Sequence, residues 1–126
     1  MPNKKRILLA EDEEHLLEAI KLNLELEGYK VSTATNGKKA LQIFKEERFN
    51  LVILDVMMPE IDGFEFLDVL RQDQAGRSIP VVVITAKTVT ADDRHRLNGG
   101  VERVLLKRTL DADALLTEVR AVVGAR

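Results

Sequence analysis

Five short apolar runs alternate along the chain with longer segments of helical periodicity. This alternation is typical of βαβ units, in which helices connect parallel strands. Three of the runs, ILLA, LVILD and VVVIT, are apolar almost throughout, as expected for strands covered by helices on both faces. We therefore predict an α/β fold with a doubly wound five-stranded parallel sheet in the order 2-1-3-4-5 and five helices. The predicted strands are Ile7–Ala10, Val31–Thr35, Leu51–Asp55, Val81–Thr85 and Val104–Leu106.

The segments between these strands carry the apolar spacing and the end signals of amphipathic helices. Asn36 is predicted to be an N-cap and Gly28 a left-handed C-terminal cap, and Asp62-Gly63 is a turn signal ahead of the third helix. The fourth helix has only Leu97 as a large apolar residue, so we predict that it is the least firmly docked. The predicted helices are Glu14–Glu27, Gly37–Glu47, Phe64–Asp73, Thr90–Asn98 and one that begins near Asp111. The stripe predicted to face the core from the first helix consists of Leu16, Leu17, Ile20, Leu24 and Leu26.

Length and composition narrow the classes of protein further. The 126 residues suit a single domain spanning residues 1–126. The net charge of -2, from 21 acidic and 19 basic residues, offers no electrostatic footprint for direct nucleic-acid binding. The chain has no cysteine and no apolar run of the roughly 18 to 20 residues that a membrane span needs. We expect a cytoplasmic protein without a membrane segment, either a monomer or a weak dimer.

Polar residues follow four of the predicted strands, and these residues carry the functional argument. Glu11 and Asp12 follow the first strand, Asp55 and Thr85 end the third and fourth, and Lys107 follows the fifth. The carboxyl ends of parallel strands meet at one edge of a sheet, where ligands bind in this class of fold. A single aspartate at a strand end is more often a turn residue. The evidence for a functional site is therefore that polar residues from four strands meet at one edge.

Three carboxylates at this edge favour a bound cation. At a separation of about 5 Å and an effective dielectric near 20, each pair repels by roughly 3 kcal/mol. Mg2+ fits best, because one or two carboxylates, water and a phosphoryl oxygen complete its octahedral shell, whereas calcium prefers more ligands. Lys107 and the Thr85 hydroxyl can bind the oxygens of a phosphoryl group, and a carboxylate can accept that group. Asp55, at the end of the central strand, is the best placed acceptor.

The chain resembles the receiver domain of two-component response regulators. The resemblance is carried by the five polar residues above, by LVILDVMMPEIDG around Asp55 and by Thr85-Ala86 at the end of the fourth strand. The chain is similar to the chemotaxis response regulators, and the family's flavodoxin-like fold is the one predicted above. The resemblance implies that Asp55 takes a phosphoryl group from a phosphohistidine on a histidine kinase or a histidine phosphotransfer protein.

The same resemblance implies a role for each residue at the sheet edge. It implies that Mg2+ is held by Glu11, Asp12, Asp55 and the Met57 carbonyl, and that Thr85 and Lys107 contact the phosphoryl group. A protein of this kind catalyses its own phosphorylation and dephosphorylation but acts mainly as a signalling switch.

The last third of the chain, from Ile84 to Val104, resembles instead the receivers attached to hybrid sensor kinases. The resemblance to the receiver family as a whole implies that phosphorylation alters the face made by the helix Thr90–Asn98, the fifth strand and the last helix. An output partner that the sequence does not identify would bind there. Many family members carry an aromatic residue at the position of Val104, whose side chain has no ring to rotate.

Two alternatives remain at the sequence level. One is a receiver-like interaction module that does not switch. The other is a flavodoxin-type carrier of FMN, but the run Glu11-Asp12-Glu13-Glu14 would repel a flavin phosphate. Acetyl phosphate with Mg2+ separates a switch from an inert module.

Overall fold

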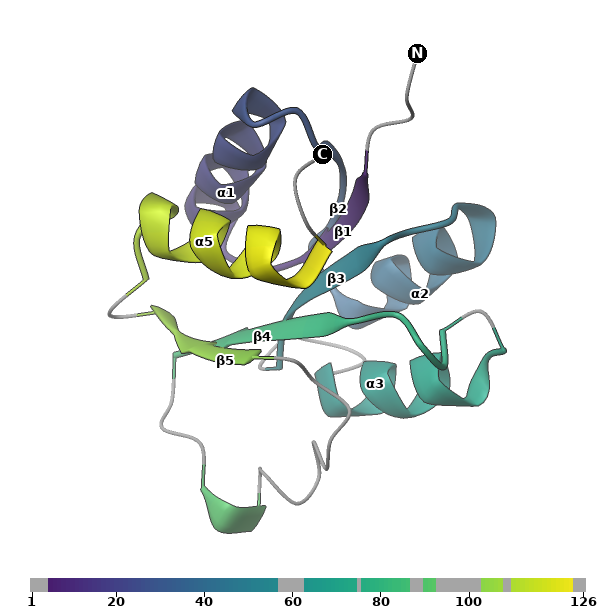
Figure 1. The fold of residues 1–126 in the computed structure, drawn as a ribbon. Helices are drawn as coiled ribbons and strands as arrows, with labels where there is room; N and C mark the ends of the chain where they lie inside the picture. Colours follow the sequence, from purple (N-terminus) through teal and green to yellow (C-terminus); the bar gives the residue numbers. More distant parts are fainter. Residues whose placement is uncertain are drawn as a thin grey trace.

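A computed structural model describes residues 5–56, 63–74, 76–86, 90–92, 103–107 and 110–123. Its centre is a five-stranded parallel sheet in the order β2-β1-β3-β4-β5 (Figure 1), which confirms the predicted topology. The strand bounds lie within one residue of the predicted ones. They are β1 (Arg6–Ala10), β2 (Lys30–Ala34), β3 (Leu51–Asp55), β4 (Val81–Thr85) and β5 (Arg103–Leu106).

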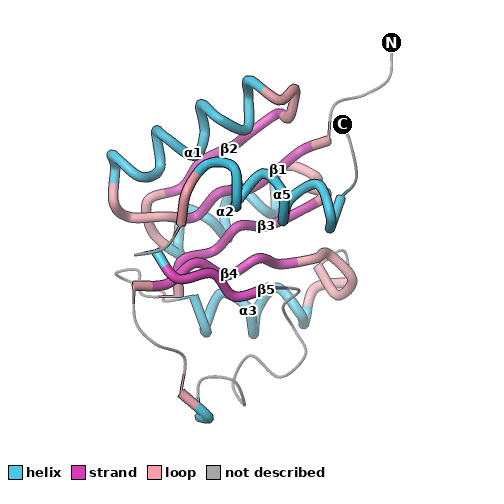
Figure 2. The backbone as a smooth tube through the Cα atoms, turned by 60° about the vertical axis from the view of Figure 1, so that its left-hand side comes forward, coloured by secondary structure: helices cyan, strands magenta, loops and turns pink. Residues whose placement is uncertain are grey.

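Helices cover both faces of the sheet. α1 and α5 lie on one face and α2 and α3 on the other (Figures 1 and 2). Among the described residues these four helices are α1 (Glu14–Leu26), α2 (Gly37–Glu46), α3 (Gly63–Gln72) and α5 (Ala112–Val123). Of the predicted helix Thr90–Asn98, only the first three residues are described, with Ala91 and Asp92 helical. The remainder of that helix, and the prediction that it docks weakly, lie outside the described residues.

The core consists of two apolar layers, one on each face of the sheet. Ile7 and Leu9 of β1 pack with α1 and α5, whereas Leu8 and Ala10 pack with α2 and α3. This alternation follows from the period of two in a strand, which sends successive side chains to opposite faces. β3 and β4 are buried along their whole length, as their continuous apolar sequences predict.

The prediction that Leu26 faces the core is wrong. Leu17, Ile20 and Leu24 of α1 are buried, but Leu26 is 74% exposed. With 3.6 residues per turn, Leu26 lies about 180° around the helix from Leu17, on the side away from the sheet. Hydrophobicity alone placed Leu26 in the stripe, and helical geometry removes it.

Both predicted helix caps are confirmed. Gly28 has a φ of 95°, and its N–H donates to the Glu25 carbonyl at 3.0 Å while the Tyr29 N–H donates to the Leu24 carbonyl at 3.2 Å. This pair of bonds is a Schellman motif, which ends α1 and turns the chain toward β2. The Asn36 side chain accepts a hydrogen bond from the backbone N–H of Lys39 at the start of α2.

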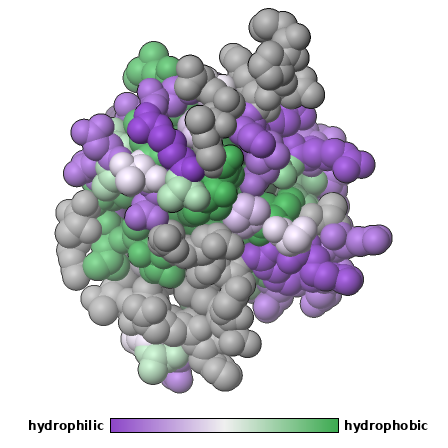
Figure 3. Space-filling model, viewed as in Figure 1, coloured by the Kyte–Doolittle hydropathy of each residue, from purple (hydrophilic) through white to green (hydrophobic). Residues whose placement is uncertain are grey.

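The surface over α1 and α5 is mixed in character. On this face, Figure 3 shows hydrophobic residues between hydrophilic ones. No helix within the described ranges has both the length and the apolar content that crossing a bilayer requires.

Candidate functional site at the carboxyl edge of the sheet

The strand register brings the predicted site residues together. Ala10 is paired with Leu54, so the residues that follow them, Glu11 and Asp55, lie side by side at the ends of β1 and β3. Thr85 is paired with Leu106, which places Lys107 just beyond Thr85. The Glu11 N–H also donates to the Ala34 carbonyl of β2 at 3.0 Å, which fixes the backbone at the first acidic position.

Three carboxylates form a compact cluster at this edge. One oxygen from each of Glu11, Asp12 and Asp55 lies within 4.8 Å of the others. Glu11 and Asp55 are buried, whereas Asp12 is exposed to solvent. The predicted proximity of the three acidic side chains is therefore present in the structure.

Lys107 supplies positive charge inside the cluster. Its ammonium nitrogen lies 2.9 Å from Glu11 Oε1 and 3.0 Å from Asp55 Oδ2, and it donates hydrogen bonds to Glu11 Oε2 and Asp55 Oδ2. From the sequence, Lys107 is expected to bind a phosphoryl group, and a metal is expected to balance the charge of the carboxylates. The structure shows that the protein compensates part of the negative charge with this lysine.

Burial and charge shift the protonation of both partners. The pKa of Glu11 is raised from 4.5 to about 7, mainly by burial and in smaller part by the negative charge of Asp55, against the opposing effect of hydrogen bonds from the Glu13 N–H and from Lys107. Burial lowers the pKa of Lys107, but hydrogen bonds and charge from Glu11 and Asp55 outweigh this effect and raise it overall. The cluster thus favours a charged lysine beside a glutamate that holds its proton up to neutral pH.

The donor set fits a hard divalent cation. Glu11 Oε2 accepts the Glu13 N–H at 2.8 Å, and Glu11 Oε1 makes the ion-pair contact with Lys107 at 2.9 Å. Three carboxylates that each bring an oxygen within 4.8 Å of the others supply the oxygen ligands that Mg2+ prefers.

Of the two other predicted site residues, the structure describes Thr85 but not Met57. Thr85 is fully buried at the end of β4, next to the strand that bears Asp55. Met57, whose carbonyl was the fourth implied metal ligand, lies outside the described residues.

Gly63 lies against this site and was not among the predicted residues. A Cβ atom at Gly63 would lie 2.4 Å from the Val56 Cα and 2.8 Å from the Asp55 carbonyl oxygen. The sequence showed only the turn signal Asp62-Gly63. A glycine at the first position of a helix, where helix formers and capping residues are preferred, was the available sign of close packing.

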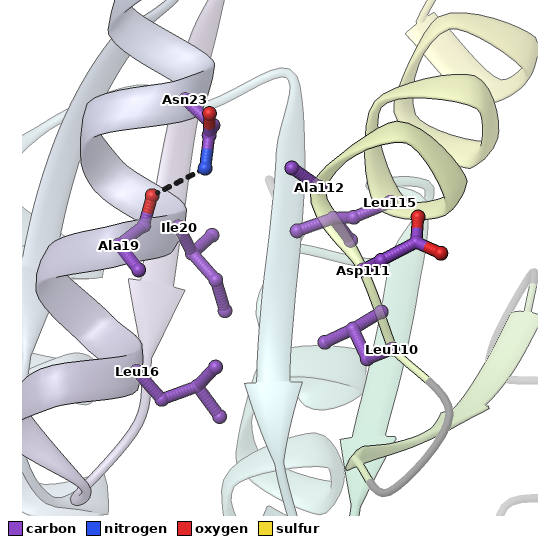
Figure 4. Close-up of a pocket in the computed structure, with 8 residues that line it drawn as sticks. All are labelled: Leu16, Ala19, Ile20, Asn23, Leu110, Asp111, Ala112 and Leu115. Carbon is purple, nitrogen blue, oxygen red and sulfur yellow. Dashed lines mark hydrogen bonds between the residues drawn. The ribbon is translucent and has the colours of Figure 1, made fainter.

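A separate pocket of about 160 Å3 lies between α1 and α5 (Figure 4). Leu16 and Ile20 line it from α1, opposite Leu110 and Leu115. Asn23 turns its amide back to the Ala19 carbonyl at 2.9 Å. The pocket shares no residue with the carboxylate cluster.

The chain matches a known protein family and its members in sequence. Residues 7–120 match the family model described as response regulator receiver domain. The response regulator ArlR of Staphylococcus saprophyticus is 36% identical over 118 residues, which cover 94% of this chain and 52% of that protein. The chain thus spans about half the length of the curated relatives it matches.

Solved structures agree with this match. The chemotaxis protein CheY4 of Vibrio cholerae superposes with a TM-score of 0.88 at 26% identity, covering 95% of this chain and 99% of that one. The response regulator TrrA of Thermotoga maritima, solved in complex with Mg2+ and BeF, has a TM-score of 0.82 at 31% identity, covering 94% and 98% of the two chains.

Proposed function

Because the chain belongs to the response regulator receiver domain family, we propose that it is a phosphoryl-accepting switch whose acceptor is Asp55. The observation that carries this proposal is the buried cluster in which Lys107 contacts both Glu11 and Asp55. A carboxylate beside an ammonium group, at a sheet edge where further acids converge, is arranged for aspartyl phosphorylation. The proposed switch is a single receiver domain over residues 1–126.

The acceptor reaction places specific demands on the cluster. A carboxylate oxygen of Asp55 attacks the phosphorus of a phosphohistidine, and the new O–P bond forms as the N–P bond breaks. The electron pair of the broken bond stays on the imidazole nitrogen of the donor. Such transfers depend on positioning and on balancing the charge of the phosphoryl oxygens. Glu11, Asp12, Asp55 and the Met57 carbonyl would hold Mg2+, which when bound neutralises part of that charge.

Lys107 links the acceptor to the rest of the site. Before transfer its ammonium pairs with the Asp55 carboxylate, and afterwards the phosphoryl group presents more negative charge at the same position. Lys107 then turns to a phosphoryl oxygen while Glu11 remains within its reach. The Thr85 hydroxyl, at the end of the neighbouring strand, donates to another phosphoryl oxygen.

The partners follow from this chemistry. The donor is a phosphohistidine on a histidine kinase or a histidine phosphotransfer protein. Movement of Lys107 and Thr85 is carried along β5 and β4 to the face formed by the helix predicted at Thr90–Asn98, β5 and α5, where an output protein binds. The chain also catalyses its own dephosphorylation, and it works as a cytoplasmic monomer or weak dimer.

Phosphorylation by a small donor tests the proposal. The purified chain with Mg2+ and acetyl phosphate should gain the mass of one phosphoryl group by intact-mass spectrometry. Asp55→Asn should gain none, whereas Asp68→Asn, at an exposed position of α3, should react like the wild type. A wild type that stays unmodified while circular dichroism shows it folded would contradict the switch and favour a non-switching interaction module.

A further inference from the structure

The first residue of α3 packs directly on the backbone that carries the acceptor. A Cβ atom at Gly63 would come within 2.4 Å of the Val56 Cα and 2.8 Å of the Asp55 carbonyl oxygen, closer than real Cβ contacts. The Gly63 N–H donates to the Val56 carbonyl at 3.2 Å. The missing side chain thus sets the spacing between α3 and the peptide that follows Asp55.

We propose that Gly63 is a positioning residue for the Asp55 carboxylate, an inference that rests on the proposed function. The two nearest atoms belong to the backbone and cannot move aside as the end of a flexible side chain can. To reach ordinary contact at 3.4 Å from the Val56 Cα, a Cβ would need a displacement of about 1 Å, the scale at which misplacement costs on the order of 100-fold in rate.

The packing of α3 decides which side moves. Phe64, Phe66 and Leu67 follow Gly63 immediately and are buried in the core layer on that face. Moving the helix outward would open space around three large side chains, which is costly in a close-packed interior. The displacement therefore falls on the end of β3, at Asp55 and Val56.

Gly76 offers a matched control beyond the other end of α3. A Cβ there would lie 2.3 Å from the Leu70 carbonyl oxygen and 2.8 Å from its Cδ1 atom. The substitution Gly76→Ala thus creates the same kind of backbone clash as Gly63→Ala. Its clash falls on the last turns of α3 instead of the acceptor.

The test compares wild type, Gly63→Ala and Gly76→Ala. We measure the Mg2+ dissociation constant by calorimetry and the rate at saturating acetyl phosphate, both per folded molecule from urea titrations. In Gly63→Ala the rate should fall about 100-fold and Mg2+ binding should weaken at least about tenfold. Gly76→Ala should lose stability yet keep both values near those of wild type.

Each outcome separates the two proposals. If wild type is phosphorylated and Gly63→Ala behaves like Gly76→Ala, the positioning role is wrong while the switch stands. If the folded wild type is not phosphorylated, the switch is wrong and the positioning role with it.

A measurement on the wild type keeps the idea testable should Gly63→Ala fail to fold. The amide resonance of Gly63 should shift on titration with Mg2+ and then beryllofluoride, and that of Gly76 should not. A Gly63 resonance that stays fixed while that of Thr85 moves would overturn the inference.

Discussion

Replacing Glu11 with glutamine should remove a pH-dependent loss of stability from the metal-free protein. Burial raises the pKa of Glu11 from 4.5 to about 7, so the folded protein holds a proton that the unfolded chain releases between these values. The unfolding free energy of wild type therefore falls as pH rises through this window and levels off above it. A shift of this size corresponds to about 3 kcal/mol.

Urea unfolding followed by circular dichroism, in buffers with a chelator, measures this effect. The difference between Glu11→Gln and wild type should be small near pH 4.5, where both side chains are neutral, and should grow to about 3 kcal/mol in favour of the variant above neutral pH. Glu18→Gln, at an exposed position of α1, controls for the change in net charge. A difference that stays constant with pH, or that grows in favour of wild type, would refute the argument that burial dominates over Lys107.

Magnesium should reverse the trend. In the proposed site the metal is held by the ionised carboxyl group of Glu11, so the Mg2+ affinity should rise with pH through the same window, and wild type should gain more stability from Mg2+ than Glu11→Gln does.

Three further predictions concern the same cluster and its output. Lys107→Met removes the ammonium that pairs with Glu11 and Asp55, so metal-free protein above neutral pH should lose about 3 kcal/mol in urea titrations, and an unchanged midpoint would contradict the pairing. Asp55→Asn removes a negative charge that raises the pKa of Glu11, so the carboxyl NMR titration of Glu11 should move to lower pH, and an unmoved titration would mean that the two groups do not interact. Val104, half-buried on β5, has no ring to act as a relay, so beryllofluoride should change amide exchange in residues 87–103 equally in wild type and Val104→Ala, and loss of the change in the variant would assign the valine to the relay.

The meeting of the site residues at one sheet edge was predictable from the sequence, because the pattern that marks each strand and its end is local. At four of the five strands a polar site residue ends or follows the strand, and parallel pairing brings the carboxyl ends of the strands to the same edge of the sheet. The contact partners of Lys107 were not predictable in this way. β5 is separated from β3 by β4, and neighbouring strands lie about 4.8 Å apart, so the four-carbon stem of Lys107 must cross one strand to reach Asp55.

Gly63 illustrates a second limit. The turn signal at Asp62-Gly63 predicted where the chain bends, but the contact with Val56 arises from how closely α3 approaches the end of β3. That approach depends on the packing of the whole helix against the sheet. Gly63 is a contact that the sequence did not predict, whereas Leu26 is a core contact that was predicted and is absent. Its apolar side chain suggested burial, but its position around the helix exposes it to solvent.

The ion pair between Lys107 and Glu11 joins residues 96 positions apart in the sequence. Contacts of such separation form late, because the entropy of closing the intervening chain must be overcome first. During synthesis, a chain that has not yet emerged as far as Lys107 carries Glu11 and Asp55 without their ammonium partner. Asp55 and Glu11 therefore gain their shared ammonium partner only after the chain has been synthesised as far as Lys107 and β5 has joined the sheet.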